Sequence, residues 1–331
     1  MNLKAYYFPS MPMCGYGNPY SYNFKKSLSS YYDLLDKDNT PVHIAVWGLL
    51  KHIFSADVYF LNWIEGIGKH RMGIIQYIIT ILCLRIIRFR RKKIVWIVHN
   101  IYPHEGIDYC YKNITDYLYK NSSLIITHSK AALEHVSTES KCPTYYFCHP
   151  FNELKLSKNI NKSDISYDVL IWGTINPYKG VIEFLEEVEN RNSRIKIIVI
   201  GKAKDNELEE KILQISNRNQ NILFVNKLAS FDELSELVKS SKFTLFPYIG
   251  GSVSSSGALI DTLFMKGNPI GPNVGAFKDF QEEGLCHVYR NYDELFQIFE
   301  KSDNRIPINK IQAFIKNNSW DNFVKTITNL L

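Results

Sequence analysis

The sequence predicts an α/β fold of two Rossmann-like domains that face each other across a cleft. The chain of 331 residues is too long for one ordinary core and fits two domains of about 150 residues each. Short β-prone stretches alternate with helical ones, which is typical of parallel sheets with helices on both faces. A polar segment rich in Asn, Lys and Ser, residues 152–166, interrupts this alternation and is typical of a linker.

Composition limits the classes of protein to consider. An apolar content of 45% is that of a globular chain and excludes disorder, and the net charge of +6 does not by itself indicate a nucleic-acid partner. None of the six cysteines forms a C-x-x-C pair, so neither a zinc knuckle nor a redox pair is predicted. The N-terminus lacks the apolar core of a signal peptide. We therefore expect a cytoplasmic protein that binds no nucleic acid.

The first domain is expected to span residues 1–155. Residues 3–8 alternate and are β-prone, and a loop rich in Gly and Pro follows at 9–19. Further strands are expected at 42–46, 58–61, 94–98, 124–127 and 144–148. Helices are expected at 20–36, 71–91, 109–120 and 129–137.

The alternation restarts in the second domain, expected at residues 156–310. Strands are predicted at 168–172, 195–200, 222–225 and 243–247. Helices are predicted at 180–189, 205–216, 230–240 and from about 255. The mostly helical end of the chain, 311–331, is expected to pack back towards the first domain. Ligands of open α/β sheets bind beyond the carboxyl ends of the strands, which directs attention to the loops there.

The loop at 173–180, "GTINPYKG", has the features of a phosphate site. Gly173 lets the backbone turn without a side chain in the way. Lys179 precedes a helix, where a cation is mildly unfavourable to the helix dipole unless an anion lies nearby. A solvated lysine at a helix start is the alternative interpretation.

A second loop in the same domain, "PYIGGSVSSSGALID" at 247–261, strengthens the phosphate interpretation. Two glycines and four serines lead into an apolar helix, and free backbone amides at a helix start attract anions. Simple N-capping by Ser254 or Ser255 is the alternative. Asp261 lies two turns into the helix, and it is either a ligand of ribose hydroxyls or an ordinary surface acid. Neither a G-x-G-x-x-G nor a P-loop occurs, which argues against a dinucleotide enzyme and an ATPase.

Four segments together resemble GT-B glycosyltransferases of the bacterial polysaccharide-assembly type. "WGTINPYKGVIEFLE" resembles their G-R-x-x-x-x-K-G loop, and "SSSGALIDTLFMKGNPIGPNVGAF" resembles their SGxLLxAxxxGxPVIxxxxG segment. "VWIVHNIYPHE" resembles a T-V-H-N loop of the first domain, and "NNSWDNFV" resembles the start of the C-terminal helix. The resemblance runs from about residue 94 to residue 324.

The resemblance implies a nucleotide-sugar donor, UDP- or GDP-linked, held in the second domain without a metal or other cofactor. It implies that Lys179 contacts the donor pyrophosphate and that the segment from Ser254 to Gly257 offers its amides. An acid near Asp261 would bind ribose. The candidate donor-binding residues are Gly173, Thr174, Lys179, Tyr248, Ser254, Ser255, Ser256, Gly257 and Asp261.

Two departures from the family pattern affect the expected mechanism. Thr174 replaces the arginine that accompanies the lysine, so fewer positive charges would neutralise the pyrophosphate. Val253 replaces the first acid of the E-x7-E pattern of retaining members, which favours an inverting subgroup such as the glucuronosyltransferases.

An inverting transfer needs a general base in the first domain. The loop after the strand 94–98 supplies His99, Glu105 and Asp108 as candidate catalytic residues. The resemblance suggests that His99 contacts the transferred sugar, and a histidine bonded to backbone is the alternative. Either carboxylate can act as the base. Trp63 follows another strand and either stacks on an acceptor sugar or fills the core.

Residues 71–93 combine an apolar run with a basic end, "RIIRFRRKK". They are either a core-facing helix with a solvated end or an edge that rests on an anionic leaflet. The second interpretation predicts peripheral association with the inner face of the membrane.

The sequence thus predicts a metal-independent hexosyltransferase that moves a sugar to a glycan or polyprenyl-diphosphate-linked acceptor in capsular or exopolysaccharide synthesis. A nucleotide-sugar 2-epimerase of the same fold and a non-catalytic binding protein stay open as alternatives.

Overall fold

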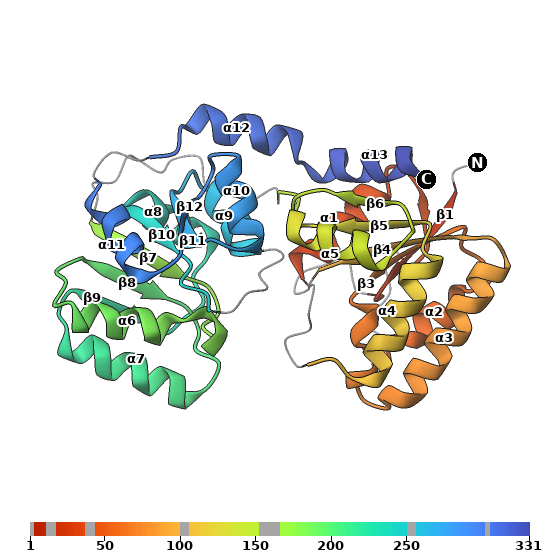
Figure 1. The fold of residues 1–331 in the computed structure, drawn as a ribbon, viewed down its shortest axis with the longest axis horizontal. Coiled ribbons are helices and arrows are strands. Elements are labelled where there is room, and N and C mark those ends of the chain that lie inside the picture. Colours follow the sequence, from red (N-terminus) through yellow and green to blue (C-terminus); the bar gives the residue numbers. More distant parts are fainter. Residues whose placement is uncertain are drawn as a thin grey trace. The chain divides into compact units, whose positions relative to one another are not determined.

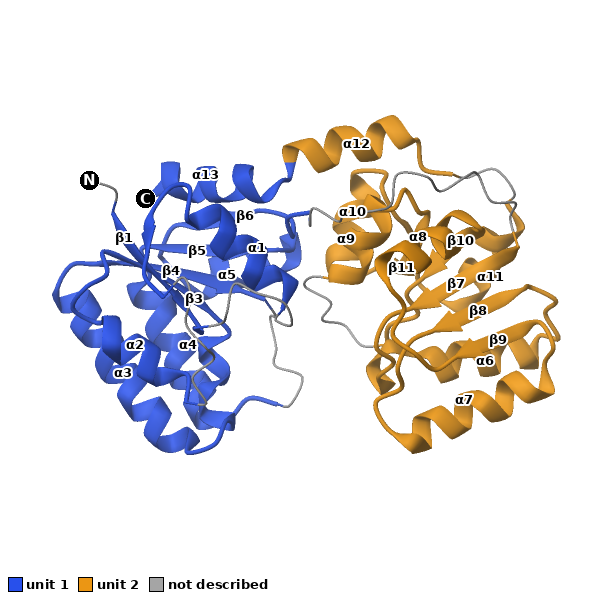
Figure 2. Ribbon diagram, turned by 180° about the vertical axis from the view of Figure 1, so that it is seen from behind, with its two compact units in different colours: residues 1–152, 318–331 blue, residues 153–317 orange. Residues whose placement is uncertain are grey.

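The structure is a computed structural model that describes residues 3–10, 18–36, 44–99, 106–151, 166–249, 256–301 and 305–331. The chain divides into two compact units, coloured separately in Figure 2. Unit 1 is Met1–Asn152 with Asn318–Leu331, and unit 2 is Glu153–Asn317. Each unit is built on a parallel six-stranded sheet, which confirms the predicted α/β class.

The sheet of unit 1 has the strand order β2-β1-β3-β4-β5-β6, and all of these strands except β2 are labelled in Figure 1. Its strands read as nearly continuous apolar runs because helices cover both faces. The strands are β1 (Lys4–Phe8), β2 (Asp33–Leu34), β3 (Val58–Asn62), β4 (Lys93–Val98), β5 (Leu124–Thr127) and β6 (Thr144–Tyr146). The 3-10 helix η1 (Ile64–Lys69) follows β3.

Two separate cores lie on the two faces of this sheet. The helices of the first core are α2 (Val46–His52), α3 (Gly73–Phe89), α4 (Tyr109–Asn121) and α5 (Lys130–Glu139). The helices of the second core are α1 (Pro19–Leu28) and α13 (Trp320–Leu330). The last helix of the chain therefore belongs to the first sheet, where Phe323 contacts Phe24 of α1 with ring centroids 5.0 Å apart.

Two predicted elements of this unit are wrong. The helix expected over 20–36 ends at Leu28, because Leu34 pairs with Ala5 and forms the edge strand β2. The strand expected over 42–46 is not formed at 44–46, and helix α2 begins at Val46 instead. A short apolar run suits either structure, and here Val46, Leu49 and Ile53 lie at helical spacing on the buried side.

Unit 2 has the strand order β12-β11-β10-β7-β8-β9. The strands are β7 (Tyr167–Trp172), β8 (Ile197–Ile200), β9 (Ile222–Val225), β10 (Ser241–Leu245), β11 (Pro269–Pro272) and β12 (His287–Tyr289). One face is covered by α6 (Val181–Asn190), α7 (Asn206–Arg218) and α11 (Tyr292–Glu300). The other elements are η2 (Pro177–Lys179), α8 (Phe231–Lys239), α9 (Gly257–Phe264), α10 (Gly275–Glu282) and α12 (Ile308–Asn317).

None of the helices in the described ranges is both long and apolar enough to cross a membrane.

Candidate functional site

The strand order of unit 2 reverses between β7 and β10. From β7 the chain adds β8 and β9 on one side, and it then returns to add β10, β11 and β12 on the other. At such a reversal, the loops that follow the two neighbouring strands run in opposite directions. The crevice between these loops, at the carboxyl ends of the strands, is where open α/β sheets bind ligands. The loops after β7 and β10 are the two that carry the predicted phosphate residues.

These two loops are packed directly against each other. The Ile249 amide donates a hydrogen bond to the Tyr178 carbonyl oxygen at 2.9 Å. Gly180 takes φ +63°, and a Cβ atom there would lie 2.1 Å from the Pro247 carbonyl oxygen. The pair of loops therefore needs a glycine at 180, which the predicted lysine–glycine motif supplies.

Lys179 is the one predicted cation at this junction. It ends η2, is half-buried, and lies with Nζ 5.8 Å from the centre of the Tyr248 ring. Burial lowers the pKa of its ammonium to about 8. Within the described residues no carboxylate lies within ion-pair distance of Nζ. A half-buried ammonium that has no carboxylate counter-ion among the described residues is suited to an incoming anion.

Gly173 lies next to this ammonium. Its φ of +98° belongs to the left-handed region, and a Cβ atom there would lie 3.4 Å from Lys179 Nζ. Thr174, which stands in the place of the family arginine, is exposed. At this position the loop therefore offers a ligand a hydroxyl group and no positive charge.

Helix α9 begins beside Tyr248 and has an open first turn. Ser256 is its N-cap and accepts a hydrogen bond from the Leu259 amide at 3.3 Å, and Tyr248 bonds the same serine side chain. Gly257 is exposed, and no described residue lies within 4 Å of where a Cβ on it would be, so the backbone there is accessible. Ser256 thus performs the capping predicted for its neighbours, while Ser254 and Ser255 lie outside the described residues.

Asp261 lies within α9 and is 9% exposed. This burial excludes the interpretation as an ordinary surface acid. Its backbone oxygen accepts the hydrogen bond of the Met265 amide at the helix end.

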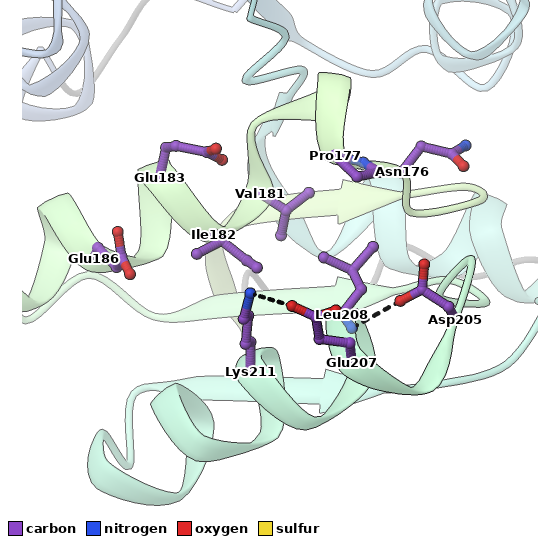
Figure 3. A pocket seen from close by; sticks show the side chains of 10 residues that line it. All are labelled: Asn176, Pro177, Val181, Ile182, Glu183, Glu186, Asp205, Glu207, Leu208 and Lys211. Atoms are coloured by element: carbon purple, nitrogen blue, oxygen red, sulfur yellow. Dashed lines mark hydrogen bonds and ion pairs between the residues drawn. The ribbon is translucent and has the colours of Figure 1, made fainter.

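A cavity of about 340 Å³ lies beside the loop that follows β7, between α6 and α7 (Figure 3). Four acids line it, and Lys211, which also lines it, pairs with Glu207 at 2.7 Å. A diphosphate would be repelled by this lining. The acidic residues of the lining are Glu183, Glu186, Asp205 and Glu207. The cavity is therefore a poor candidate for the anion site predicted at Lys179 and the start of α9.

In unit 1, His99 follows β4 and is buried. Its Nε2 bonds the Asn62 side-chain oxygen at 3.0 Å, and its ring stacks on Trp63 with centroids 4.1 Å apart. Burial, together with His128 and His149, holds the pKa of His99 well below its ordinary value. The low pKa favours the neutral imidazole, and the described contacts of His99 are with side chains, namely those of Asn62 and Trp63.

The two histidines beside it were not predicted. His128 follows β5 and His149 follows β6, so the parallel sheet brings three strand-end histidines together. His128 donates from Nδ1 to the Phe147 carbonyl at 2.7 Å, so its Nε2 accepts the Tyr20 hydroxyl, also at 2.7 Å. Burial lowers the pKa of His128 to about 3 and that of His149 to about 4. The sequence signal that could have predicted this cluster is the position of His128 and His149, each directly after a predicted strand.

Asp108 has a structural task. It is the N-cap of α4, and its Oδ1 accepts the Tyr111 amide at 2.7 Å. Glu105, the other predicted base, lies outside the described residues. Nearby, Glu65 is buried against the indole of Trp96 at 3.3 Å, and burial raises the pKa of this carboxyl to about 7.

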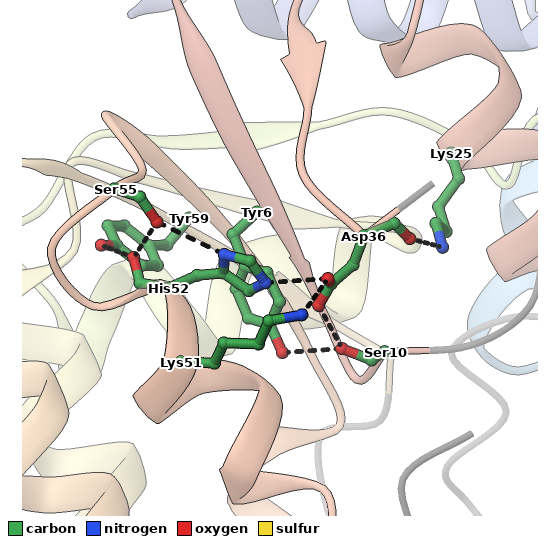
Figure 4. A network of polar contacts seen from close by, with 8 residues as sticks. All are labelled: Tyr6, Ser10, Lys25, Asp36, Lys51, His52, Ser55 and Tyr59. Atoms are coloured by element: carbon green, nitrogen blue, oxygen red, sulfur yellow. Dashed lines mark hydrogen bonds and ion pairs between the residues drawn. The ribbon is translucent and has the colours of Figure 1, made fainter. Parts of the chain in front are cut away.

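A polar network joins the ends of β1 and β2 to α2 (Figure 4). Asp36 Oδ1 lies 2.8 Å from His52 Nε2, and Ser10 Oγ donates to Asp36 Oδ2 at 3.3 Å. Lys25 Nζ donates to the Asp36 carbonyl at 3.0 Å. The Asp36 carboxylate already has polar partners, so we assign this network the structural role of holding the segments after β1 and β2 against α2.

Comparison with solved structures finds the same fold in glycosyltransferases. Anabaena Alr3699/HepE in complex with UDP has a TM-score of 0.68 at 12% identity, with 100% of both chains covered. AviGT4, a glycosyltransferase involved in avilamycin A biosynthesis, has a TM-score of 0.59 at 11% identity and covers 100% of this chain and 97% of its own. An E. coli trehalose-6-phosphate protein bound with UDP-2-fluoro glucose has a TM-score of 0.60 at 12% identity, over 87% of this chain and 76% of its own.

No family model and no curated protein sequence matches this chain. The structural likeness establishes the predicted GT-B fold.

Proposed function

We propose that the chain is a nucleotide-sugar glycosyltransferase whose donor diphosphate binds in unit 2, between Lys179 and the first turn of α9. The observation that carries the proposal is the half-buried Lys179 ammonium at the strand-order reversal, next to an accessible helix start. Charge-assisted bonds to the ammonium and the free amides would both stabilise a diphosphate. HepE complexes with UDP and UDP-glucose support a UDP-linked donor.

In the proposed reaction an acceptor hydroxyl oxygen attacks the anomeric carbon of the donor sugar. The bond from that carbon to the β-phosphate oxygen breaks, and the nucleoside diphosphate leaves with the electron pair. The ammonium of Lys179 and the α9 amides stabilise the charge that develops on this leaving group. We propose that these groups replace a metal ion, so that transfer continues in the presence of EDTA.

The hydroxyl proton passes to a general base of unit 1, for which Glu105 and Asp108 are the candidates. His99 is proposed to position the neighbouring strand end through Asn62 and Trp63. We further propose a hexose donor, an inverting outcome, and a glycan or lipid-linked glycan acceptor in surface polysaccharide synthesis, in the cytoplasm.

Nucleotide binding tests the proposal first. Thermal unfolding is measured with UDP, GDP, CDP and dTDP, because a ligand that binds the native state raises the melting temperature. We expect UDP to raise it most. Lys179→Ala should weaken UDP binding about 10- to 100-fold, the loss of one charge-assisted interaction, without changing the melting temperature of the free protein.

Lys196→Ala is the matched control. Lys196 is an exposed lysine of the same unit that precedes β8, at the opposite edge of the sheet, so UDP binding should be unchanged. Absence of a melting-temperature shift with all four nucleotides would overturn the proposal. Binding without sugar transfer would favour the non-catalytic alternative, and acceptor-independent epimerisation of the donor would favour the epimerase.

The base is tested by Asp108→Asn. Asparagine caps a helix as well as aspartate does, so α4 should keep its stability while the basic oxygen is lost. If Asp108 is the base, turnover falls by about 100-fold or more at unchanged melting temperature. Full turnover in Asp108→Asn assigns the base elsewhere, and Glu105→Gln is then the next variant.

A further inference from the structure

Helix α3 carries apolar residues on two sides, since Leu84 and Ile87 are buried in the core of unit 1 and a second apolar set is exposed. Gln76, Thr80 and Cys83 are buried in unit 1, while Ile75, Ile78 and Leu82 are exposed. The exposed apolar side chains from Met72 to the helix end are Met72, Ile74, Ile75, Ile78, Leu82, Ile86 and Phe89. Positions 75, 78, 82, 86 and 89 are spaced by three or four residues, so they form one stripe along the helix.

Helix α2 lies beside α3 and extends the apolar surface, as both views show (Figures 1 and 2). Its exposed apolar side chains, Trp47 and Leu50, are followed by Phe54, which is 69% exposed. Arg90 ties the two helix ends together, because its guanidinium lies 5.3 Å from the Phe54 ring and donates to the Ile53 carbonyl at 2.9 Å. We call this combined surface, formed by Trp47, Leu50, Phe54 and the exposed residues of α3, the α2–α3 face.

The segments that form the α2–α3 face carry basic residues and no acidic ones. Residues 39–56 and 66–104 contain no Asp or Glu. The second of these stretches carries Lys69, Arg71, Arg85, Arg88, Arg90, Arg91, Lys92 and Lys93. Lys92 of this group forms an ion pair with Asp57 at 2.7 Å. Arg85 and Arg88 are exposed beside the apolar stripe.

We propose that the α2–α3 face docks on an anionic lipid bilayer surface. An apolar stripe with basic residues at its side and no acids is the pattern of a helix that lies in the plane of the interface. Large aromatic side chains such as Trp47 and Phe89 enter the headgroup region, while the arginines contact lipid phosphates.

A second copy of the chain would fit this surface poorly. In a symmetric dimer the arginines and lysines of one copy would face those of the other. The segments of the face contain no acid to pair with them, so the like charges would repel. The bilayer supplies both the apolar phase and the negative charge that the face lacks. The proposal needs no nucleotide, so its failure would leave the proposed sugar transfer untouched.

Co-sedimentation of the full chain with vesicles tests the proposal. Vesicles of phosphatidylcholine with phosphatidylglycerol should bind the protein, vesicles of phosphatidylcholine alone should bind it much less, and added salt should reduce binding to the anionic vesicles. Leu82→Glu should reduce the partition coefficient about tenfold, because it places a carboxylate in the exposed stripe. Arg85→Ser with Arg88→Ser should reduce it about twentyfold.

Leu228→Glu is the matched control, since Leu228 is a 70% exposed leucine of unit 2. It should bind vesicles as the unchanged protein does. Leu82→Glu should keep the melting temperature and the UDP affinity, which shows that its fold is intact. No binding to anionic vesicles would overturn the proposal, and so would a dimer in solution that Leu82→Glu dissociates.

Discussion

At the scale of single residues, the proposed activity depends on Lys179 being charged. Burial against Tyr248 lowers the pKa of its ammonium to about 8, close to the working range of a cell. The same burial removes competing water, which strengthens any bond to a diphosphate. The low pKa is therefore a measurable signature of the site.

UDP affinity should fall as pH rises through about 8. The protonated amine binds the diphosphate, so binding is complete below this pKa and is lost above it. A bound anion raises the pKa, which places the midpoint at or above 8. Titration calorimetry between about pH 7 and 9.5 measures this. Lys179→Arg should bind UDP at the highest pH as well as at the lowest, because arginine keeps its charge; an unchanged pH slope in that variant would contradict the explanation.

The buried histidines predict loss of stability in mild acid. His128 and His149 have folded-state pKa values of about 3 and 4, below the ordinary value of 6.5. The unfolded chain therefore takes up protons that the folded chain does not, and the free energy of unfolding falls as pH drops below about 6.5. The expected loss is on the order of 2 kcal/mol for each histidine by pH 5.

Urea unfolding at pH 7 and pH 5 checks this prediction. His149→Gln should show a smaller difference between the two pH values. His70→Gln, a change of an exposed histidine, should leave the difference as it is in the unchanged protein. Equal stability at both pH values would show that the three-histidine cluster is not held neutral.

At the scale of elements, the junction of the loops after β7 and β10 is the feature that positions the site. Its geometry depends on Gly180, whose backbone touches Pro247. The start of α9 is built differently, since Gly257 has free space around it and an ordinary backbone conformation.

Gly180→Ala should lower the free energy of unfolding by about 2 kcal/mol or more, because the new methyl group meets a carbonyl oxygen at a positive φ. Gly257→Ala is the paired control. It should be neutral or stabilising by up to about 1 kcal/mol, because alanine favours the helix and meets no neighbour. Denaturant unfolding of both variants measures the difference. The reverse order of the two stabilities would refute the packing described for the junction.

At the scale of the molecule, the end of the chain completes the first unit. Helix α13 begins after a backbone bridge between Phe151 and Ser319, and it buries Trp320 and Phe323 on the sheet that the first half of the chain forms. The stability of unit 1 therefore depends on residues more than 150 positions away in sequence from its last strand.

Phe323→Ala should destabilise unit 1 by roughly 3–5 kcal/mol, the range for removing a fully buried aromatic ring. Leu330→Ala in the same helix, at a 45% exposed position, should change stability by no more than about 0.5 kcal/mol. Thermal unfolding followed by tryptophan fluorescence reports on both. Equal effects of the two changes would place α13 outside the core.

Much of the fold was predictable because its signals are local. Apolar runs predicted most strands, including β4 and β7. A Gly-and-Lys loop at 173–180 and a Gly- and Ser-rich loop at 247–261 predicted the two segments that meet beside Lys179. The predictions failed where local signals conflict with pairing. Val46 suited a strand by composition, and residues 29–36 suited a helix until Leu34 paired with β1.

The sequence by itself determined the α/β class, the alternation of elements in each half, and the glycine, lysine and serine loops, because capping, turn conformation and periodicity act over a few residues. Only the tertiary structure decided the order of the strands, the meeting of His99 with His128 and His149, and which apolar residues of α3 stay exposed. Those features depend on which distant segments pair and pack, and contacts between distant segments leave no periodic trace in a single sequence.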